Sequence, residues 1–197
     1  VLFFIADRKH AATLAGKIRD ELGRKLDLMD PNKFEFCIIK DFPKYEWNEE
    51  EEKYDFTHNP FNNPKGGSKA LENENIDEIV AEQFDFVCNG VEMASGAVRN
   101  HDPEVMKKAF AVVGLGEDVI EEKFGALYTA FQYGAPPHAG MAPGIDRMLM
   151  MLLDEDSIRE TIAFPLNANG ADSLMQAPSD ISELQLREAH IKIREKN

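Results

Sequence analysis

Six polar side chains stand in stretches whose other residues are mostly apolar or small, and they are the first candidates for chemistry. They are His58, Asp85, Glu92, Ser95, Arg99 and Arg147. Paired carboxylates can hold a hard cation, and arginines bind anions in charge-assisted hydrogen bonds. The set therefore indicates a site that handles anions and a metal ion. A buried network of structural ion pairs is the alternative that these residue types leave open.

Arg147 lies in the stretch around which the chain is organised, residues 134–153. The small residues within 140–144 would let a flat ligand or another backbone approach closely. Asp146 and Arg147 then begin a helix whose next six residues are apolar, and we expect that run to be buried. The charged pair is either a structural salt bridge or an anion-binding group, and spacing alone does not decide between these two.

Four of the six candidates belong to a predicted β-hairpin over residues 84–99, with an Asn-Gly turn. In an ideal two-residue hairpin, Asp85 and Glu92 would face opposite sides of the sheet. A shared metal ion therefore requires a change of phase between them. We expect a β-bulge or a wider turn, which Gly90 and Gly96 allow.

The elements around this hairpin predict an α+β fold, an antiparallel sheet flanked by helices. The predicted helices are 11–26, 102–113, 117–131, the one beginning at Asp146, and 154–161. The helix 117–131 is expected to bury one face, formed by Ile120, Phe124, Leu127 and Phe131. The other predicted strands are 2–5, 34–42, 162–165 and the hairpin 44–57 with an acidic tip. Residues 62–68 are expected to be a mobile flap, and 69–83 a polar surface excursion.

The composition argues for a globular protein and against a general nucleic-acid binder. The 197 residues are 43% hydrophobic and 29% charged, with a net charge of −14. Such a chain lacks the basic stripe of non-specific nucleic-acid binding. No apolar run approaches the ~20 residues of a membrane span, and we expect a cytoplasmic protein without a signal peptide. Cys37 and Cys88 lack metal-site spacing, so no zinc site is predicted.

Residues 140–147, Gly-Met-Ala-Pro-Gly-Ile-Asp-Arg, resemble motif 3 of the class II aminoacyl-tRNA synthetases. The neighbouring stretches 133–140 and 158–165 are most similar to the bacterial-type aspartyl-tRNA synthetases. The resemblance covers nearly the whole chain, 1–197, as the C-terminal part of a class II catalytic domain. It leaves out motifs 1 and 2, the anticodon-binding OB-fold and the inserted bacterial domain. We therefore expect a chain that begins within a longer protein and holds half of an ATP site.

The resemblance implies a ligase that uses ATP and Mg²⁺ to convert L-aspartate to aspartyl-adenylate and then charges tRNA. The implied catalytic residues are Glu92, Arg99 and Arg147. Those implied in ATP binding are Glu92, Gly144, Ile145, Asp146 and Arg147. Those implied in aspartate binding are His58, Ser95 and Arg99, and the implied metal ligands are Asp85 and Glu92. Full-length members imply a homodimer.

The role implied for Arg99 is to hold the side-chain carboxylate of aspartate in a bidentate fork, a geometry that lysine cannot supply. Asparagine would leave that guanidinium underpaired. Two alternatives stay open at this point. One is a relative that passes aspartyl-adenylate to another acceptor such as ammonia, and the other is a non-catalytic binding fragment. The sequence does not tell whether the enzyme also charges the tRNA for asparagine.

Overall fold

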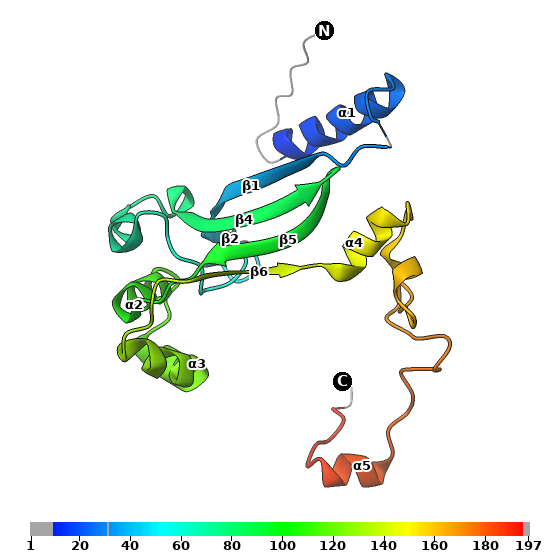
Figure 1. The fold of residues 1–197 in the computed structure, drawn as a ribbon. Coiled ribbons are helices and arrows are strands. Elements are labelled where there is room, and N and C mark those ends of the chain that lie inside the picture. The colour runs from blue at the N-terminus through cyan, green and yellow to red at the C-terminus, as the bar shows by residue number, and fades with distance from the viewer. Residues whose placement is uncertain (1–9, 31, 195–197) are drawn as a thin grey trace.

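A four-stranded antiparallel sheet forms the centre of the structure, a computed structural model that describes residues 10–30 and 32–194 (Figure 1). Its strands, in spatial order, are β1 (Phe36–Pro43), β4 (Val80–Cys88), β5 (Val91–Val98) and β6 (Ala139–Pro143). Helices flank this sheet, so the predicted α+β architecture is confirmed. The predicted strand 2–5 lies outside the described residues.

A separate two-stranded sheet is formed by β2 (Tyr45–Asn48) and β3 (Lys53–Phe56), as the sequence predicts. The acidic residues between these strands are exposed at the turn. Tyr45 is buried at the base of this hairpin, and its hydroxyl donates a hydrogen bond of 3.0 Å to the backbone oxygen of Ala109. The hairpin is thereby joined to the helical segment between β5 and β6.

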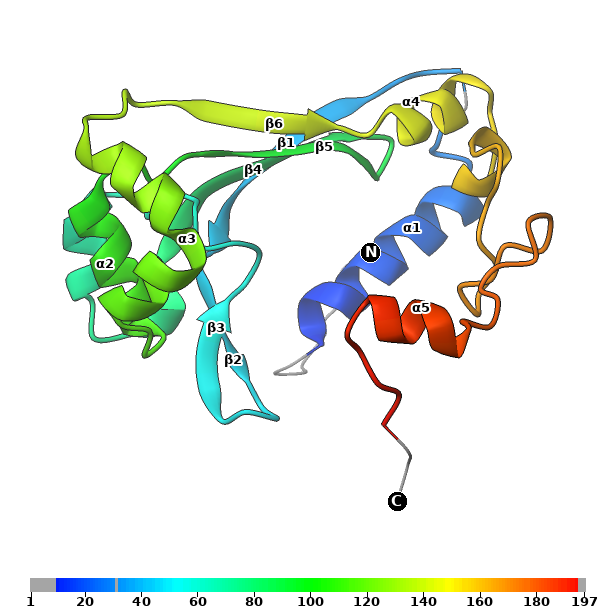
Figure 2. The ribbon, with the colours of Figure 1, turned by 90° about the horizontal axis from the view of Figure 1, so that it is seen from below.

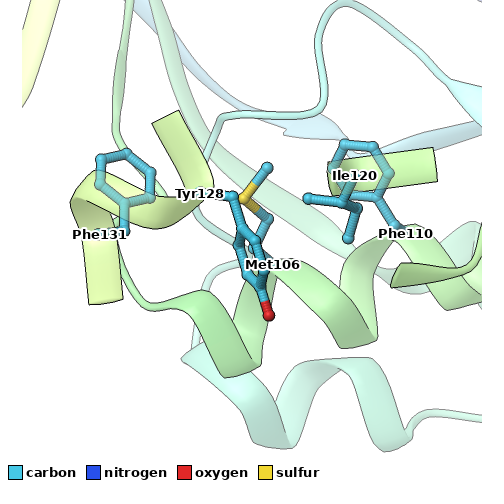
Figure 3. Packing of buried hydrophobic residues seen from close by; sticks show 5 residues of the cluster. All are labelled: Met106, Phe110, Ile120, Tyr128 and Phe131. Atoms are coloured by element: carbon cyan, nitrogen blue, oxygen red, sulfur yellow. The ribbon is translucent and has the colours of Figure 1, made fainter. Parts of the chain in front are cut away.

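The densest packing lies between helices α2 (Pro103–Val112) and α3 (Glu117–Gln132). Asp102 caps α2, because its carboxylate accepts the backbone N–H of Glu104 at 2.8 Å. The buried side chains of this core are Met106, Phe110, Ile120, Tyr128 and Phe131 (Figure 3). Their burial anchors both helices against the end of the sheet.

The buried face of α3 differs from the prediction at one position. Leu127 is 38% exposed, and Tyr128 takes its place in the core. The reason is a kink at Phe124, where φ is −131° and ψ is 17°. Side chains beyond this kink are rotated relative to those of a regular helix. A prediction from uniform helical periodicity therefore chose Leu127 where Tyr128 is buried.

The opposite end of the sheet carries α1 (Ala11–Lys25) and α4 (Ile145–Leu152), followed by a 3₁₀ turn (Ile158–Thr161) and α5 (Glu183–Glu188). Neither α1 nor α4 has a buried residue. The expectation that the apolar run after Arg147 is buried is therefore wrong within this chain, and Leu152 is 70% exposed. Only β5 and the 3₁₀ turn lie extensively against α4 in the described structure.

Three further predictions need correction. Residues 162–165 form no strand, and the helix expected over 154–161 is only the 3₁₀ turn. The stretch 69–83 is a surface excursion only at its beginning, where two 3₁₀ turns, Gly67–Glu72 and Ile76–Glu78, occur. Its end is already β4, in which Ala81 and Gln83 are buried. None of the helices in the described ranges is long and apolar enough to cross a membrane.

Candidate active site on one face of the sheet

Asp85, Glu92 and Ser95 lie on the same face of the sheet, and a β-bulge at Met93 is what brings Ser95 to that face. Val87 pairs with Glu92, whereas Asp85 pairs with Ser95, so β5 contains one extra residue between these two pairs. Asp85 and Val87 share a face because strand side chains alternate, and their partners Ser95 and Glu92 share it with them. A bulge is present as predicted, with Met93 as the extra residue and neither of the two glycines. The expectation that Asp85 and Glu92 need it to share a face is wrong, because the pairing of Val87 with Glu92 already places Glu92 on the side of Asp85. The bulge instead brings Ser95 to that side.

Arg99, one residue beyond the end of β5, extends over this same face. Gly140 pairs with Ala97, and a Cβ atom built at Gly140 would lie 3.7 Å from Nη2 of Arg99. Ala97 is two residues from Ser95, so the guanidinium lies on the side of Asp85 and Ser95. It has no ion pair or hydrogen bond to any side chain that the structure describes. Its donors are therefore available to a ligand.

Arg147 reaches the opposite end of this face from the first turn of α4. Its Nη1 atom lies 3.0 Å from Oε1 of Glu92 and donates a hydrogen bond of 2.8 Å to the backbone oxygen of the same residue. The two side chains are 42% and 44% exposed. The N–H of Gly144 also donates to the Met93 oxygen at 2.8 Å, which attaches the helix start to the bulge. Arg147 therefore forms a salt bridge with Glu92 and not with the adjacent Asp146.

Asp85 and Glu92 together fit a magnesium ion that arrives with a phosphate ligand. The Oδ1 atom of Asp85 is buried and has no hydrogen-bond partner in the structure as described. No group of three or more metal-ligating side chains occurs among the described residues. Mg²⁺ commonly takes one or two carboxylates and completes its octahedron with water and phosphate oxygens. Two carboxylates are therefore too few to hold a metal ion permanently, and they suit a Mg²⁺ ion that arrives bound to a nucleotide.

A cavity of about 1290 Å³ separates this face from α1. Asp85 and Glu92 line its sheet side, and Ile18 and Leu22 line its helix side. The apolar part of the sheet wall includes Ile39, which pairs with Asp85. The sequence reasoning missed this β1 contribution, although alternation along 36–43 was the signal that could have revealed it.

His58 lies away from the large cavity. Its ring packs edge-on against Phe42, with ring centroids 5.4 Å apart, and it lines a separate hollow of about 410 Å³ beside Trp47 and Asp55. Phe42 pairs with Ala81, which precedes Asp85 by four residues on β4. A register shift separates this pair from the Lys40–Phe84 pair. His58 is therefore placed at the end of the sheet that is remote from Glu92 and Arg147.

The segment between His58 and the sheet is a fixed wedge, which we define as residues 61–65. It inserts between the ends of β4 and β5. The N–H of Asn63 donates to the Val98 oxygen, and the Asn63 oxygen accepts from the N–H of Glu82, both at 2.8 Å. Asn62 and Pro64 are fully buried. The expectation of a mobile flap is therefore wrong for this part of 62–68, because its backbone is bonded on both sides.

With this geometry in hand, the sequence can be compared with known proteins. Residues 7–168 match the family described as tRNA synthetases class II (D, K and N). The chain belongs to this family. The predicted recognition is confirmed at this level, and we refer to the chain below as the synthetase chain.

Curated relatives of the synthetase chain carry the name aspartate–tRNA(Asp/Asn) ligase. One, from Phenylobacterium zucineum (strain HLK1), is 56% identical over 97% of the chain and 32% of the relative. Another, from Rickettsia akari (strain Hartford), is 51% identical over 98% of the chain and 33% of the relative. The chain thus spans about a third of the length of the curated relatives it matches.

Solved structures support the fold. The aspartyl tRNA synthetase from Entamoeba histolytica aligns with 86% of the synthetase chain and 29% of its own chain, at a TM-score of 0.53 and 22% identity. At that identity the likeness shows the fold alone. Together with the family match, it confirms the predicted class II catalytic architecture.

The stretch that resembles motif 3, residues 140–147, is divided between β6 and the start of α4. Gly144 lies against Arg147, because a Cβ atom at this glycine would be 3.4 Å from Cδ of the arginine. Ile145 and Asp146 are exposed at the helix start. The cavity lining includes Asp85 and Glu92 but none of residues 144–147. The structure thus gathers Asp85, Glu92 and Arg147, while a nucleotide pocket at Ile145 and Asp146 stays a prediction.

Proposed function

We propose that the protein containing the synthetase chain activates L-aspartate with ATP and transfers it to tRNA. The observation that carries this proposal is the register of β5 around the bulge at Met93. It puts Ser95 and Arg99 on the face that holds the carboxylates of Asp85 and Glu92, and Arg147 pairs with Glu92 there. The similarity to curated aspartate–tRNA(Asp/Asn) ligases over 97% of the chain supports the choice of substrate. We also propose that the chain is the C-terminal part of the catalytic domain.

The activation step joins the α-carboxylate of aspartate to the α-phosphorus of ATP and releases pyrophosphate. The protein contributes positioning and charge neutralisation to such a reaction, with no covalent intermediate of its own. Arg99 binds the side-chain carboxylate of the substrate in a bidentate fork, and Ser95 and His58 contact the same amino acid. Because a guanidinium donates and cannot accept hydrogen bonds, the amide of asparagine is a poor partner for it.

At the other end of the face, Asp85 and Glu92 would hold Mg²⁺, which when bound neutralises phosphate charge and orients the leaving pyrophosphate. Arg147 then binds an ATP phosphate. In the structure it pairs with Glu92 at 3.0 Å, and both side chains are partly exposed. Exposed pairs contribute up to about 1 kcal/mol, so exchanging this partner for a phosphate costs little. The ion pair keeps both groups oriented before ATP binds.

The acceptor is proposed to be tRNA, on the strength of the curated relatives' names. Those names include both the aspartate and the asparagine tRNA, so we propose that both are substrates. The alternative acceptor, ammonia, has no support from these relatives. A cytoplasmic homodimer stays a prediction from the resemblance, and light scattering of the full-length protein would test the dimer.

The direct test is ATP–pyrophosphate exchange by the full-length protein, measured with L-aspartate and with L-asparagine. We expect exchange with aspartate only, followed by charging of both tRNA species. Exchange with asparagine at a comparable rate would contradict the role of Arg99. Absence of exchange with either amino acid would overturn the proposed reaction. The 197-residue chain alone should show no exchange, and micromolar ATP binding by calorimetry would show that the site needs fewer residues than proposed.

A further inference from the structure

The synthetase chain buries a lysine without giving it a carboxylate partner. Lys44 is 0% exposed. Its Nζ atom donates hydrogen bonds to the backbone oxygen and to Oδ1 of Asn62, at 2.8 and 2.7 Å. The rings of Tyr45 and Phe56 lie 5.6 and 5.3 Å from this nitrogen. Since burial of an amine disfavours its charged form, the fold bears a desolvation cost to make these two hydrogen bonds.

Asn62 carries this contact into the central sheet. Its side chain is buried, and Nδ2 donates to Oε1 of Gln83 on β4 at 3.1 Å. Its backbone forms an antiparallel bridge with Arg99. The chain Lys44–Asn62–Arg99 is therefore continuous through hydrogen bonds and one backbone bridge.

The wedge, residues 61–65, then fixes the backbone on both sides of Arg99. The Val98 oxygen accepts from Asn63 at 2.8 Å, and the N–H of Asn100 donates to the Phe61 oxygen at 2.7 Å. On the β6 side, the N–H of Arg99 itself donates to the His138 oxygen at 2.9 Å. Removal of the wedge would leave the residue held from the β6 side only.

Lys44 also contacts the segment that leads to His58. The Lys44 backbone oxygen accepts the N–H of Thr57 at 3.2 Å. Lys44 is thus connected to both proposed aspartate contacts at this end of the sheet. Its backbone oxygen bonds the residue before His58, and its side chain bonds Asn62, which forms the bridge with Arg99. Among the described residues, the other lysine attached to the wedge, Lys65, is exposed and pairs with Asp41 at 2.7 Å on the surface.

We propose that Lys44 is a positioning residue for aspartate recognition, which acts by fixing Asn62 and, through the wedge, the backbone from which Arg99 reaches the substrate. This inference rests on the proposed function, since that function gives Arg99 its role. Lys44 does not touch the substrate, because it is fully buried. It determines where the guanidinium stands, and it has no part in the nucleotide end of the face.

The test is steady-state exchange kinetics of the full-length protein carrying Lys44→Met, which keeps the length of the side chain and removes its hydrogen bonds. We expect the KM for aspartate to rise about tenfold, since small displacements of a binding group are costly. The KM for ATP should stay within twofold. Lys65→Met is the matched control, and it should change neither constant.

Asn62→Ser breaks the same link from its other side and serves as the second variant if Lys44→Met does not fold. The double variant should show no larger rise in the KM for aspartate than either single change, because both act on one link. An unchanged KM for aspartate would overturn the proposal. Parallel rises in both KM values with a lower melting temperature would also overturn it, because they indicate a general structural role.

Hydrogen exchange separates a failure of this inference from a failure of the proposed function. Lys44→Met should accelerate exchange at the amides of Asn63 and Asn100, whatever reaction the protein catalyses, and protected amides in the variant would refute the link. A wild-type protein without aspartate-dependent exchange of pyrophosphate would instead refute the proposed function, and with it the aspartate part of the inference.

Discussion

Helices α2 and α3 and the β2–β3 hairpin lie at one end of the molecule, and α1 and α4 lie at the other (Figure 2). The first region closes around buried aromatic side chains, whereas α1, β1 and α4 leave apolar side chains exposed. Phe110 is 1% exposed in the first region, while Ile38 is 64% and Leu152 70% exposed in the second. The candidate site spans both regions. Its proposed aspartate end adjoins the closed core through the wedge, and its proposed nucleotide end is held by surface contacts.

The two arginines of the candidate site are therefore positioned in two different ways. Arg99 is positioned by backbone hydrogen bonds to His138 and, through its two neighbours, to the wedge, in which Asn62 and Pro64 are fully buried. Arg147 is positioned by a partly exposed ion pair and by the attachment of Gly144 to the bulge. Substitutions should therefore affect stability strongly at the first end and weakly at the second. The following predictions test that difference.

The largest effect is expected for Phe110→Ala. This side chain is fully buried and touches both Phe56 and Phe124, with ring centroids 5.2 and 5.7 Å apart. Truncation of a buried aromatic leaves a cavity and costs about 3–5 kcal/mol. Leu152→Ala, on the exposed α4, should cost less than about 0.5 kcal/mol. Denaturant unfolding of both variants measures the difference, and equal losses would contradict the contrast between the two ends.

The next effect concerns pH and Lys44. Burial lowers the pKa of Lys44 from 10.5 to about 7 in the folded protein. Between these values the unfolded chain holds a proton that the folded protein lacks, so this group makes stability rise with pH. The slope is at most about 1.4 kcal/mol per pH unit. Below pH 7 both states are protonated and the contribution is constant.

Lys44→Met should remove that slope, because methionine does not titrate. The stability of wild type relative to the variant should therefore increase steadily from pH 7 to pH 10. Urea unfolding at several pH values gives this difference, and other titrating groups cancel because both proteins share them. A relative stability that is independent of pH would show that Lys44 keeps an ordinary pKa.

A smaller loss is expected for Gly96→Ala, on the face of β5 opposite to the candidate site. A Cβ atom there would lie 2.6 Å from the ring of Phe84 and 2.7 Å from the backbone oxygen of Gly140. The backbone cannot give way freely, so overpacking should cost about 1–3 kcal/mol. Gly125→Ala in α3 meets no atom within 4 Å and should stabilise by up to about 1 kcal/mol. Opposite signs in thermal melts are expected, and a neutral Gly96→Ala would mean that β6 moves without cost.

A small effect on stability is also expected for Arg147→Ala. The salt bridge to Glu92 is exposed on both sides, so its loss should change the free energy of unfolding by less than about 1 kcal/mol. Differential scanning calorimetry of the variant measures this change. A drop in melting temperature comparable to that of Phe110→Ala would show that the ion pair is structural and not a ligand-binding arrangement.

The sequence predicts this fold well where local signals and burial agree. Alternation and an Asn-Gly turn identify the β4–β5 hairpin, and Asp102 with Pro103 identifies the start of α2. The helix α4 was predicted, but its expected burial was wrong. An apolar run shows that a helix can be buried and does not identify the surface that covers it. The kink at Phe124 was missed although Gly125 follows it, because an isolated glycine within a helical pattern is usually tolerated.

The candidate site was predictable as a set of residues and less so as a geometry. A bulge was expected to bring Asp85 and Glu92 together, but the bulge that exists re-phases Ser95, and no signal in the sequence selects Met93 as the extra residue. The Arg147–Glu92 pair joins residues 55 positions apart, and pattern reasoning gives no access to such a contact. Lys44 was missed entirely, because its burial depends on the wedge, which looked like a polar loop.

The central claim is that one face of the sheet divides aspartate and nucleotide binding between its two ends. Exchange kinetics of Arg99→Lys and Arg147→Ala in the full-length protein test it most directly, with both substrates varied. We predict that Arg99→Lys raises the KM for aspartate, because about 2–5 kcal/mol of binding free energy is lost. The KM for ATP should stay unchanged. Arg147→Ala should lower adenylate formation about 10²-fold and leave the KM for aspartate near that of wild type. Identical changes in both variants, or near-wild-type exchange in either, would contradict the claim.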